Sequence, residues 1–221
     1  MTGFDDAVVA ERVEAIRSLV DAHADRPVRI VAVTKRFGPP AVLAAAAAGI
    51  VDVGENYAQE LVATAAGVED IDPTAAATLR WHFIGHLQRN KVKAVAPLVA
   101  CWQTLDSVRL GAEIAKRAPG AEVLVQVNAT GAAGQSGVDA AEAPAVVEGL
   151  RALDLSVRGL MCMGAHGDRQ ATTAAFVALR RLADELELVE CSMGMSADLV
   201  EALEAGSTMI RVGSALFGPR P

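Results

Sequence analysis

Short apolar runs alternate with longer amphipathic stretches along most of the chain. Each short run ends at a glycine or a polar side chain and is typical of a strand that is buried on both faces. The longer stretches repeat their apolar positions at helical spacing. We therefore expect eight strands, at residues 28–35, 50–56, 80–85, 101–106, 122–128, 155–164, 188–194 and 209–213.

Helices are expected between these strands and before the first one. The pattern of residues 5–24 predicts an additional N-terminal helix, with a lead-in that reaches residue 27. Gly49 is expected to end a helix and Ser107 to cap the start of one, and residues 67–74 to form a loop. The other helices are expected at residues 39–48, 57–66, 87–99, 108–117, 140–153, 171–185 and 197–205.

This regular alternation of strand and helix predicts a parallel sheet covered by helices. Eight units allow the sheet to close, so we expect an α/β fold, a TIM-type (β/α)8 barrel that forms a single domain over residues 1–221. An open, doubly wound sheet is the alternative. The first strand is not followed by the G-x-G-x-x-G motif of open dinucleotide-binding sheets, and this favours the barrel.

Composition limits the partners of the protein. A formal charge of −7 and a sequence pI near 5.1 argue against nucleic acid as the main partner. The three cysteines have neither disulfide nor metal-binding spacing, as is usual in a reducing compartment. The acidic N-terminus does not resemble a signal peptide, and no apolar segment is long enough to span a bilayer. We expect a cytoplasmic protein with no membrane partner.

Lys35 lies at the end of the first predicted strand. An ammonium group at the end of a buried strand is costly to desolvate, and desolvation shifts a lysine toward its nucleophilic free base. Such an amine can capture a carbonyl compound. The alternative is a lysine whose side chain extends from the strand end into solvent.

The last two predicted strands both lead into glycine and serine. Ser192, Gly194 and Ser196 lie at the seventh strand, and Gly213 and Ser214 at the eighth. Glycine allows close approach of the backbone, serine donates a hydroxyl, and amides at a helix start attract anions. Because these are the usual phosphate loops of a (β/α)8 barrel, we expect a phosphate site. For each loop alone, the alternative is a tight turn followed by a helix cap.

A lysine that faces a phosphate site predicts a phosphorylated aldehyde held as a Schiff base, with pyridoxal 5′-phosphate (PLP) as the leading candidate. Arg211, on the eighth strand, faces either outward to a helix carboxylate or inward beneath the ring. Because arginine does not give up its proton, an inward Arg211 would leave the pyridine nitrogen unprotonated. The ring would then be a weak electron sink and a poor catalyst of carbanion chemistry.

Six blocks of sequence form a pattern that extends over nearly the whole chain. They are VAVTK at 31–35, GENY at 54–57, WHFIG-x-LQ-x-NK at 81–91, RGLM at 158–161, SMGMS-x-D at 192–198 and GSTMIRVGS-x-LFG at 206–218. In this order they resemble the pyridoxal phosphate homeostasis protein family. The resemblance implies a single-domain cytoplasmic barrel that is related to the N-terminal domain of bacterial alanine racemases.

The same resemblance implies roles for individual residues. Lys35 would carry PLP as a Schiff base, Asn56 would lie beside the phenolic oxygen of the ring, and Arg211 would face the pyridine nitrogen. This chain has Gln135 where the family usually carries a lysine, so the loop at 131–137 lacks that cation. The phosphate would be surrounded by Ser192, Gly194, Ser196, Gly213 and Ser214, and the predicted cofactor-binding set also includes Met161 and Met193.

The resemblance implies a protein that holds and buffers PLP in vitamin B6 homeostasis and has no established reaction. A racemase of this lineage needs a second acid/base from a C-terminal domain, and we expect one face of the cofactor to lack that base here. PLP-dependent apo-enzymes are the expected recipients of the cofactor. We also expect a monomer.

Two other functions remain open. The first is a weak, racemase-like PLP enzyme that acts on amino acids, with a proton donor from among Tyr57, His82 and His86. The second is an aldolase in which Lys35 captures a phosphorylated sugar directly and Glu55 or Asp106 transfers a proton. His82 and His86 are four residues apart at a strand end, where this spacing does not put both rings on one face, so no metal site is expected.

Overall fold

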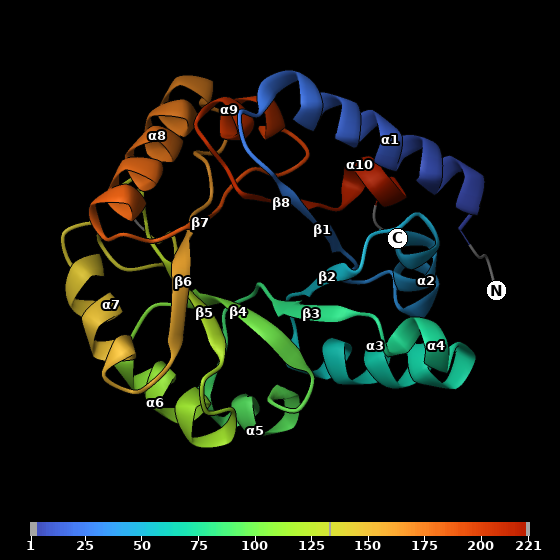
Figure 1. Ribbon diagram of the computed structural model, residues 1–221, viewed down its shortest axis with the longest axis horizontal. Coiled ribbons are helices and arrows are strands. Elements are labelled where there is room, and N and C mark those ends of the chain that lie inside the picture. Colours follow the sequence, from blue (N-terminus) through green and yellow to red (C-terminus); the bar gives the residue numbers. More distant parts are fainter. Residues whose placement is uncertain (1–3, 133, 220–221) are drawn as a thin grey trace.

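The computed structural model describes residues 4–132 and 134–219. Eight parallel strands form a closed barrel in which each strand pairs with the next and the eighth pairs with the first (Figure 1). This confirms the predicted (β/α)8 barrel. The strands are β1 Arg29–Val33, β2 Asp52–Glu55, β3 Arg80–Phe83, β4 Val99–Leu105, β5 Glu122–Gln126, β6 Ser156–Met161, β7 Glu190–Ser192 and β8 Met209–Val212.

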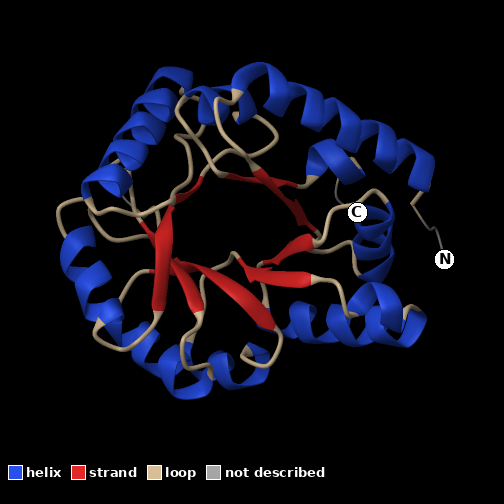
Figure 2. Ribbon diagram, viewed as in Figure 1, coloured by secondary structure: helices blue, strands red, loops and turns tan. Residues whose placement is uncertain are grey.

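Helices surround the ring of strands on the outside (Figure 2). Within the described ranges, no helix combines the length and apolar character that crossing a bilayer requires. The helices are α1 Asp6–His23, α2 Pro39–Ala47, α3 Ala58–Ile71, α4 Pro73–Ala76, the 3₁₀-helix η1 Arg89–Lys91, α5 Val92–Val95, α6 Val108–Arg117, α7 Ala143–Arg151, α8 Arg169–Glu185, α9 Leu199–Glu204 and α10 Ser214–Phe217.

The N-terminal helix α1 is additional to the barrel, as the sequence predicts. The Asp5 carboxylate caps its start by accepting hydrogen bonds from two backbone amides of the first turn. Val9, Val13 and Ile16 are buried on one face of the helix, which packs against α2, α9 and α10. Helix α1 therefore covers the barrel beside the junction of its first and last strands.

The prediction of a loop at residues 67–74 is wrong. Helix α3 continues through Gly67, and the next helix, α4, begins almost at once. The carboxylate of Asp72 accepts hydrogen bonds from the amides of Thr74 at 3.0 Å and Ala75 at 2.9 Å and so caps α4. A glycine inside a helix is tolerated when packing stabilises the helix, and here a Cβ on Gly67 would lie 2.6 Å from Pro39.

The prediction of a single helix at residues 87–99 is also wrong. The chain forms η1 and then only one turn of helix, α5, before β4 begins at Val99. Pro97 explains the early end, because its ring nitrogen has no hydrogen to donate to a helical hydrogen bond. The predicted helix over residues 108–117 and its Ser107 cap are confirmed.

Charged side chains meet at the amino ends of the strands. Arg29 lies 4.0 Å from Asp52 and 3.4 Å from Glu190, while Arg80 lies 3.6 Å from Asp52 and 3.4 Å from Glu122. Each of these five groups therefore has an opposite charge beside it. The amino end of the barrel is therefore held by ion pairs within the protein, and ligand sites of this fold lie at the opposite end.

Candidate functional site

The carboxyl ends of β1, β7 and β8 lie beside one another at one rim of the barrel (Figure 1). Because the three strands are parallel, Lys35 leaves the barrel at the same end as the loops that begin at Met193 and Gly213. A Cβ on Gly213 would lie 3.3 Å from the carbonyl oxygen of Val33, so the loop after β8 contacts the end of β1. The structure thus brings the Lys35 segment and both serine–glycine loops to one rim.

A tight turn carries Lys35 away from β1. The Thr34 hydroxyl donates a hydrogen bond to Glu55 Oε1 at 2.8 Å, and the Phe37 amide donates to the Thr34 carbonyl at 3.0 Å. Arg36 has a φ of 68°, in the left-handed region that few non-glycine residues occupy. Lys35 itself is half-buried. The turn therefore fixes the backbone around the predicted Schiff-base lysine.

Glu55 and Asn56, at the end of β2, contain buried polar atoms that nothing within residues 4–132 and 134–219 satisfies. These atoms are Glu55 Oε2 and Asn56 Oδ1. Burial raises the pKa of Glu55 to about 7, while the hydrogen bond from Thr34 and the charge of Lys35 oppose the shift. An unsatisfied buried acceptor is costly, and an amide side chain can turn to offer either its oxygen or its nitrogen to a ligand. Asn56 is thus suited to contact a polar ligand.

The loop after β7 is tied directly to β8 and α10. Gly194 has a φ of 97°, and a Cβ there would lie 2.6 Å from the Cβ of Ala202, so the position requires glycine. The Gly194 carbonyl accepts a hydrogen bond from the Arg211 amide at 2.9 Å. The Ser196 hydroxyl accepts one from the Ala215 amide at 3.2 Å. Together with the exposed Ser214, these contacts form a rigid turn of small residues at the rim.

Arg211 faces into the barrel, which decides between the two orientations that the sequence left open. Its Nη1 donates a hydrogen bond to the Ser192 hydroxyl at 2.7 Å, and its Nη2 donates to the Cys162 carbonyl at 2.8 Å. Only 4% of the residue is exposed, and burial lowers the pKa of its guanidinium from the ordinary value. Among the described residues, no carboxylate lies within ion-pair distance of it. Arg211 is therefore a buried cation close to the rim.

Ser192 is the first step of a hydrogen-bonded chain inside the barrel. Its hydroxyl lies 2.6 Å from Gln103 Oε1, and Gln103 Nε2 lies 2.8 Å from His82 Nδ1. The other ring nitrogen of His82 lies 2.7 Å from Asp52 Oδ1. Gln103 and Asp52 were not identified from the sequence. A polar side chain within a predicted buried strand was the available signal in each case.

The two methionines of the predicted site are buried. Met161, at the end of β6, packs with Cys101 and Leu124 in a small cluster, and Met193 belongs to the main apolar core. Contact of either methionine with a cofactor stays a prediction.

Burial raises the pKa of the thiols of all three cysteines to about 12, so they remain protonated.

The side chains of the enzymatic alternatives lie in different surroundings. His82 is fully buried, and both of its ring nitrogens have partners in the chain described above. Tyr57 and His86 are exposed and line a small hollow next to Asn56. Asp106 lies 4.0 Å from the ring of His86. Tyr57 and His86 are thus the proton donors of that set that a ligand at the rim could reach.

The loop that contains Gln135 folds back on itself. Gln135 accepts a hydrogen bond from the Thr130 hydroxyl and donates one to the Met163 carbonyl at 3.2 Å. A cavity of about 970 Å³ lies against this loop. It is lined by residues that follow β5, β6 and β7, among them Gln135, Met163, His166, Asp168, Met195 and Asp198.

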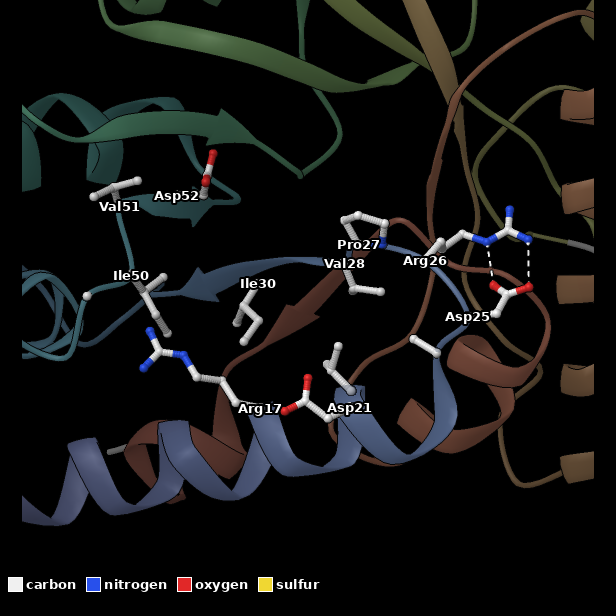
Figure 3. A pocket seen from close by; sticks show the side chains of 13 residues that line it. Arg17, Asp21, Asp25, Arg26, Pro27, Val28, Ile30, Ile50, Val51 and Asp52 are labelled. Carbon is white, nitrogen blue, oxygen red and sulfur yellow. Dashed lines mark hydrogen bonds and ion pairs between the residues drawn. The ribbon is translucent and has the colours of Figure 1, made fainter.

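A second hollow lies at the other end of the barrel, between α1 and the amino ends of β1 and β2 (Figure 3). Arg17 and Asp21 of α1 line it together with Asp52, and Asp25 and Arg26 pair with each other at its edge. Binding sites in this fold lie at the carboxyl ends of the strands, so we assign this hollow no role. Across the described ranges, no group of three or more His, Cys, Asp and Glu side chains is placed to hold a metal ion.

Fold and rim together define a class: a parallel (β/α)8 barrel with a lysine after β1 and a serine–glycine rim at β7 and β8. The family model for the alanine racemase N-terminal domain matches residues 7–221. The chain is 36% identical to the pyridoxal phosphate homeostasis protein of Pseudomonas aeruginosa, over 96% of this chain and 94% of that protein. It is 37% identical to the human protein of the same name, over 96% and 84% of the two chains. The chain belongs to the alanine racemase N-terminal domain family, among the pyridoxal phosphate homeostasis proteins.

Solved structures agree with this assignment. PipY of Synechococcus elongatus PCC7942 with PLP bound has a TM-score of 0.82 and 32% identity, and the match covers 95% of this chain and all of PipY. The alanine racemase from Corynebacterium glutamicum has a TM-score of 0.72 at 17% identity, over 99% of this chain and 62% of the racemase. The second likeness concerns the fold alone.

Proposed function

We propose that this protein binds PLP at the carboxyl rim of the barrel, with Lys35 holding the aldehyde as a Schiff base, and that it buffers and delivers the cofactor. Its relatives in Pseudomonas aeruginosa and humans are named for PLP homeostasis, and PipY holds PLP in its structure. We place the protein in the cytoplasm as a monomer. PLP-dependent apo-enzymes would receive the cofactor.

The position of Arg211 carries this proposal. Its strand, β8, lies between the strand that leads to Lys35 and the strand that ends at Ser192. The guanidinium is buried, and its hydrogen bonds to Ser192 and Cys162 use two of the five N–H groups of an arginine. Among the described residues no carboxylate lies within ion-pair distance of this buried cation, and only the more distant charge of Asp198 acts on it. Such a cation favours an anionic ligand with an additional acceptor. PLP fits, because it has a phosphate and a ring nitrogen.

The other rim residues suit the remaining groups of PLP. Asn56 has a buried amide oxygen that no described residue satisfies, and it can turn to meet the phenolic oxygen. The turn that joins Ser196 to Ala215 offers hydroxyls and backbone amides for the phosphate, with Ser214 exposed beside it. Each polar group of the cofactor would therefore meet a side chain or backbone group of matching character.

Arg211 also favours buffering over catalysis. Bound PLP can serve as an electron sink for reactions of amino acids, and it does so best when its ring nitrogen is protonated. Arg211 donates hydrogen bonds but does not release its proton, so the ring nitrogen beside it would stay unprotonated. We therefore expect tight holding of PLP with little turnover.

Absorption spectroscopy and peptide mapping test the binding proposal. Purified protein mixed with PLP should become yellow, and reduction with borohydride should fix the cofactor on the peptide that contains Lys35. Protein that stays colourless, or label found on another lysine, contradicts the proposed site. To test delivery, loaded protein is mixed with a PLP-dependent apo-enzyme, whose activity should return.

Incubation of the loaded protein with a panel of amino acids separates buffering from catalysis. We expect cofactor transfer without conversion of any amino acid. Turnover at ordinary enzymatic rates, on the order of 10 per second, would favour the racemase-like alternative with Tyr57 or His86 as proton donor. These two residues lie beside Asn56 at the rim, which makes this alternative testable by their substitution.

A further inference from the structure

A directional chain of hydrogen bonds crosses the inside of the barrel from the rim to the opposite end. It begins at the buried cation Arg211, passes through Ser192, Gln103 and His82, and ends at the anion Asp52. Asp52 in turn lies near two arginines of the amino-end ion pairs, Arg29 and Arg80, 4.0 Å and 3.6 Å away. The middle three side chains are fully buried.

The chain has one direction, which follows from the chemistry of its members. Arg211 can only donate, so the Ser192 hydroxyl accepts from it and must give its own hydrogen to Gln103. The Gln103 oxygen therefore faces Ser192, and its amide nitrogen donates to His82 Nδ1. His82 then carries its proton on Nε2, which donates to Asp52. Each donor in the chain points toward the carboxylate.

If the oxygen and nitrogen of the Gln103 side-chain amide changed places, the order of donors and acceptors would be broken. Its nitrogen would face Ser192, which would then receive two donors and have no acceptor for its own hydrogen. Its oxygen would face His82 Nδ1 and require a second proton on the ring. Because a buried polar atom without a partner is costly, the observed direction is the one that satisfies every member.

We propose that Gln103 and His82 are positioning residues that fix the Ser192 hydroxyl beneath Arg211 and so hold its guanidinium toward the ring of the bound cofactor. The inference rests on the proposed PLP site and adds to it two residues that would not touch PLP. The chain occupies one N–H group of Arg211, and the Cys162 carbonyl accepts from a second. Without Gln103, the Ser192 hydroxyl can rotate. The Nη1 group of Arg211 then loses an acceptor that is held in a fixed position.

The direction of the hydrogen-bonded chain is tested on the protein without cofactor. In ¹⁵N-histidine NMR spectra, with the signal assigned by a His82→Gln variant, we expect neutral His82 with its proton on Nε2. Gln103→Glu replaces the donor that faces Nδ1 by an acceptor, so His82 should become doubly protonated. A wild-type His82 with its proton on Nδ1, or one unaffected by Gln103→Glu, overturns the proposed direction.

The link to the cofactor is tested by equilibrium binding of PLP and by the absorption maximum of the bound form. Gln103→Leu removes the hydrogen bonds of Gln103 to Ser192, His82 and the Met209 sulfur, and should weaken PLP binding about tenfold, the order expected when a buried hydrogen-bond partner is lost, and shift the absorption maximum. Gln103→Glu keeps an acceptor for Ser192 and should restore both values nearly to those of wild type. Val99→Ala, a volume change at the amino end of the same strand that removes no member of the chain, is the matched control.

The outcomes separate the two proposals. If wild-type protein does not bind PLP, the proposed function is wrong, whatever the NMR result. If wild type binds PLP and Gln103→Leu matches Val99→Ala in affinity and absorption maximum, the positioning role alone is wrong. If Gln103→Leu does not fold, the comparison of Gln103→Glu with wild type decides, because a large loss of affinity in that variant contradicts a chain that needs only an acceptor at Ser192.

Discussion

The Ser196 hydroxyl accepts a hydrogen bond from the Ala215 amide at 3.2 Å and thereby joins the loop after β7 to helix α10. The two segments follow neighbouring strands, so this bond closes the rim at the place where we propose the phosphate to bind. The bond is made between two parts of the protein itself. Such preorganisation lowers the cost of ordering the loops when an anion binds.

Ser196→Ala should therefore weaken PLP binding by about three- to tenfold, since one hydrogen bond of about 1 kcal/mol is lost and the two loops can separate. Fluorescence titration with PLP measures the effect. Ser107→Ala is the matched control, because it removes a hydroxyl that caps α6, away from β7 and β8, and should leave the affinity unchanged. Equal affinities for Ser196→Ala and wild type would contradict the phosphate assignment.

Lys35→Ala should abolish covalent capture of PLP and retain part of the non-covalent affinity. The reason is that the rim formed by Arg211 and the two loops does not depend on the lysine side chain. Borohydride reduction followed by intact mass measurement should show no added cofactor, while titration should still show saturable binding. Lys93→Ala, which changes an exposed lysine after β3, should behave as wild type. Full covalent labelling of the Lys35 variant would show that another lysine is used.

Gly85→Ala should destabilise the protein by more than about 2 kcal/mol, as expected when added volume meets a fixed backbone. A Cβ at Gly85 would lie 2.1 Å from the carbonyl oxygen of Asn56, so β2 or β3 must move and Asn56 with it. Urea unfolding measures the change. Gly120→Ala is the control: its φ of 72° strains any other residue, but no atom lies within 4 Å. If both variants lose the same free energy, the close contact at Asn56 is not the cause.

The position of Lys35 relative to Gly213 could be predicted from the sequence. Eight alternating units imply a closed parallel sheet, and closure places the first strand beside the last. The ends of β1 and β8 then have to meet at one rim, and the structure shows that they do. The inward direction of Arg211 could not be chosen in advance, because the residues on both sides of it in the strand are apolar and allow either face.

The hydrogen-bonded chain from Ser192 to Asp52 could not be predicted from the sequence, for a different reason. Its members come from four strands, and their contacts depend on how far each strand is shifted along its neighbour. Ser192 pairs with Met209, for example, while the register shifts within the β3–β4 and β4–β5 pairs. Such shifts arise from the packing of the whole barrel, and no local pattern around Gln103 encodes them.

Glu55→Gln should stabilise the protein at high pH and have little effect at low pH. The pKa of Glu55 is raised from 4.5 to about 7, chiefly by burial, so the folded state keeps a proton that the unfolded state releases. Between these two values the folded state binds more protons, and the free energy of unfolding of wild type falls as the pH rises. Below pH 4.5 both states are protonated and this cost is absent.

Because a glutamine side chain mimics the protonated carboxyl, the Glu55→Gln variant should exceed wild type in free energy of unfolding by up to about 3 kcal/mol at pH 8 and by less than about 1 kcal/mol at pH 5. The amide oxygen of the new side chain can keep the hydrogen bond from Thr34. Urea unfolding of cofactor-free protein at the two pH values measures both differences. Glu69→Gln, at an exposed position of α3, should show none of this dependence. A Glu55→Gln difference that is the same at pH 5 and pH 8 would show that Glu55 is already ionised in the folded protein at the lower pH.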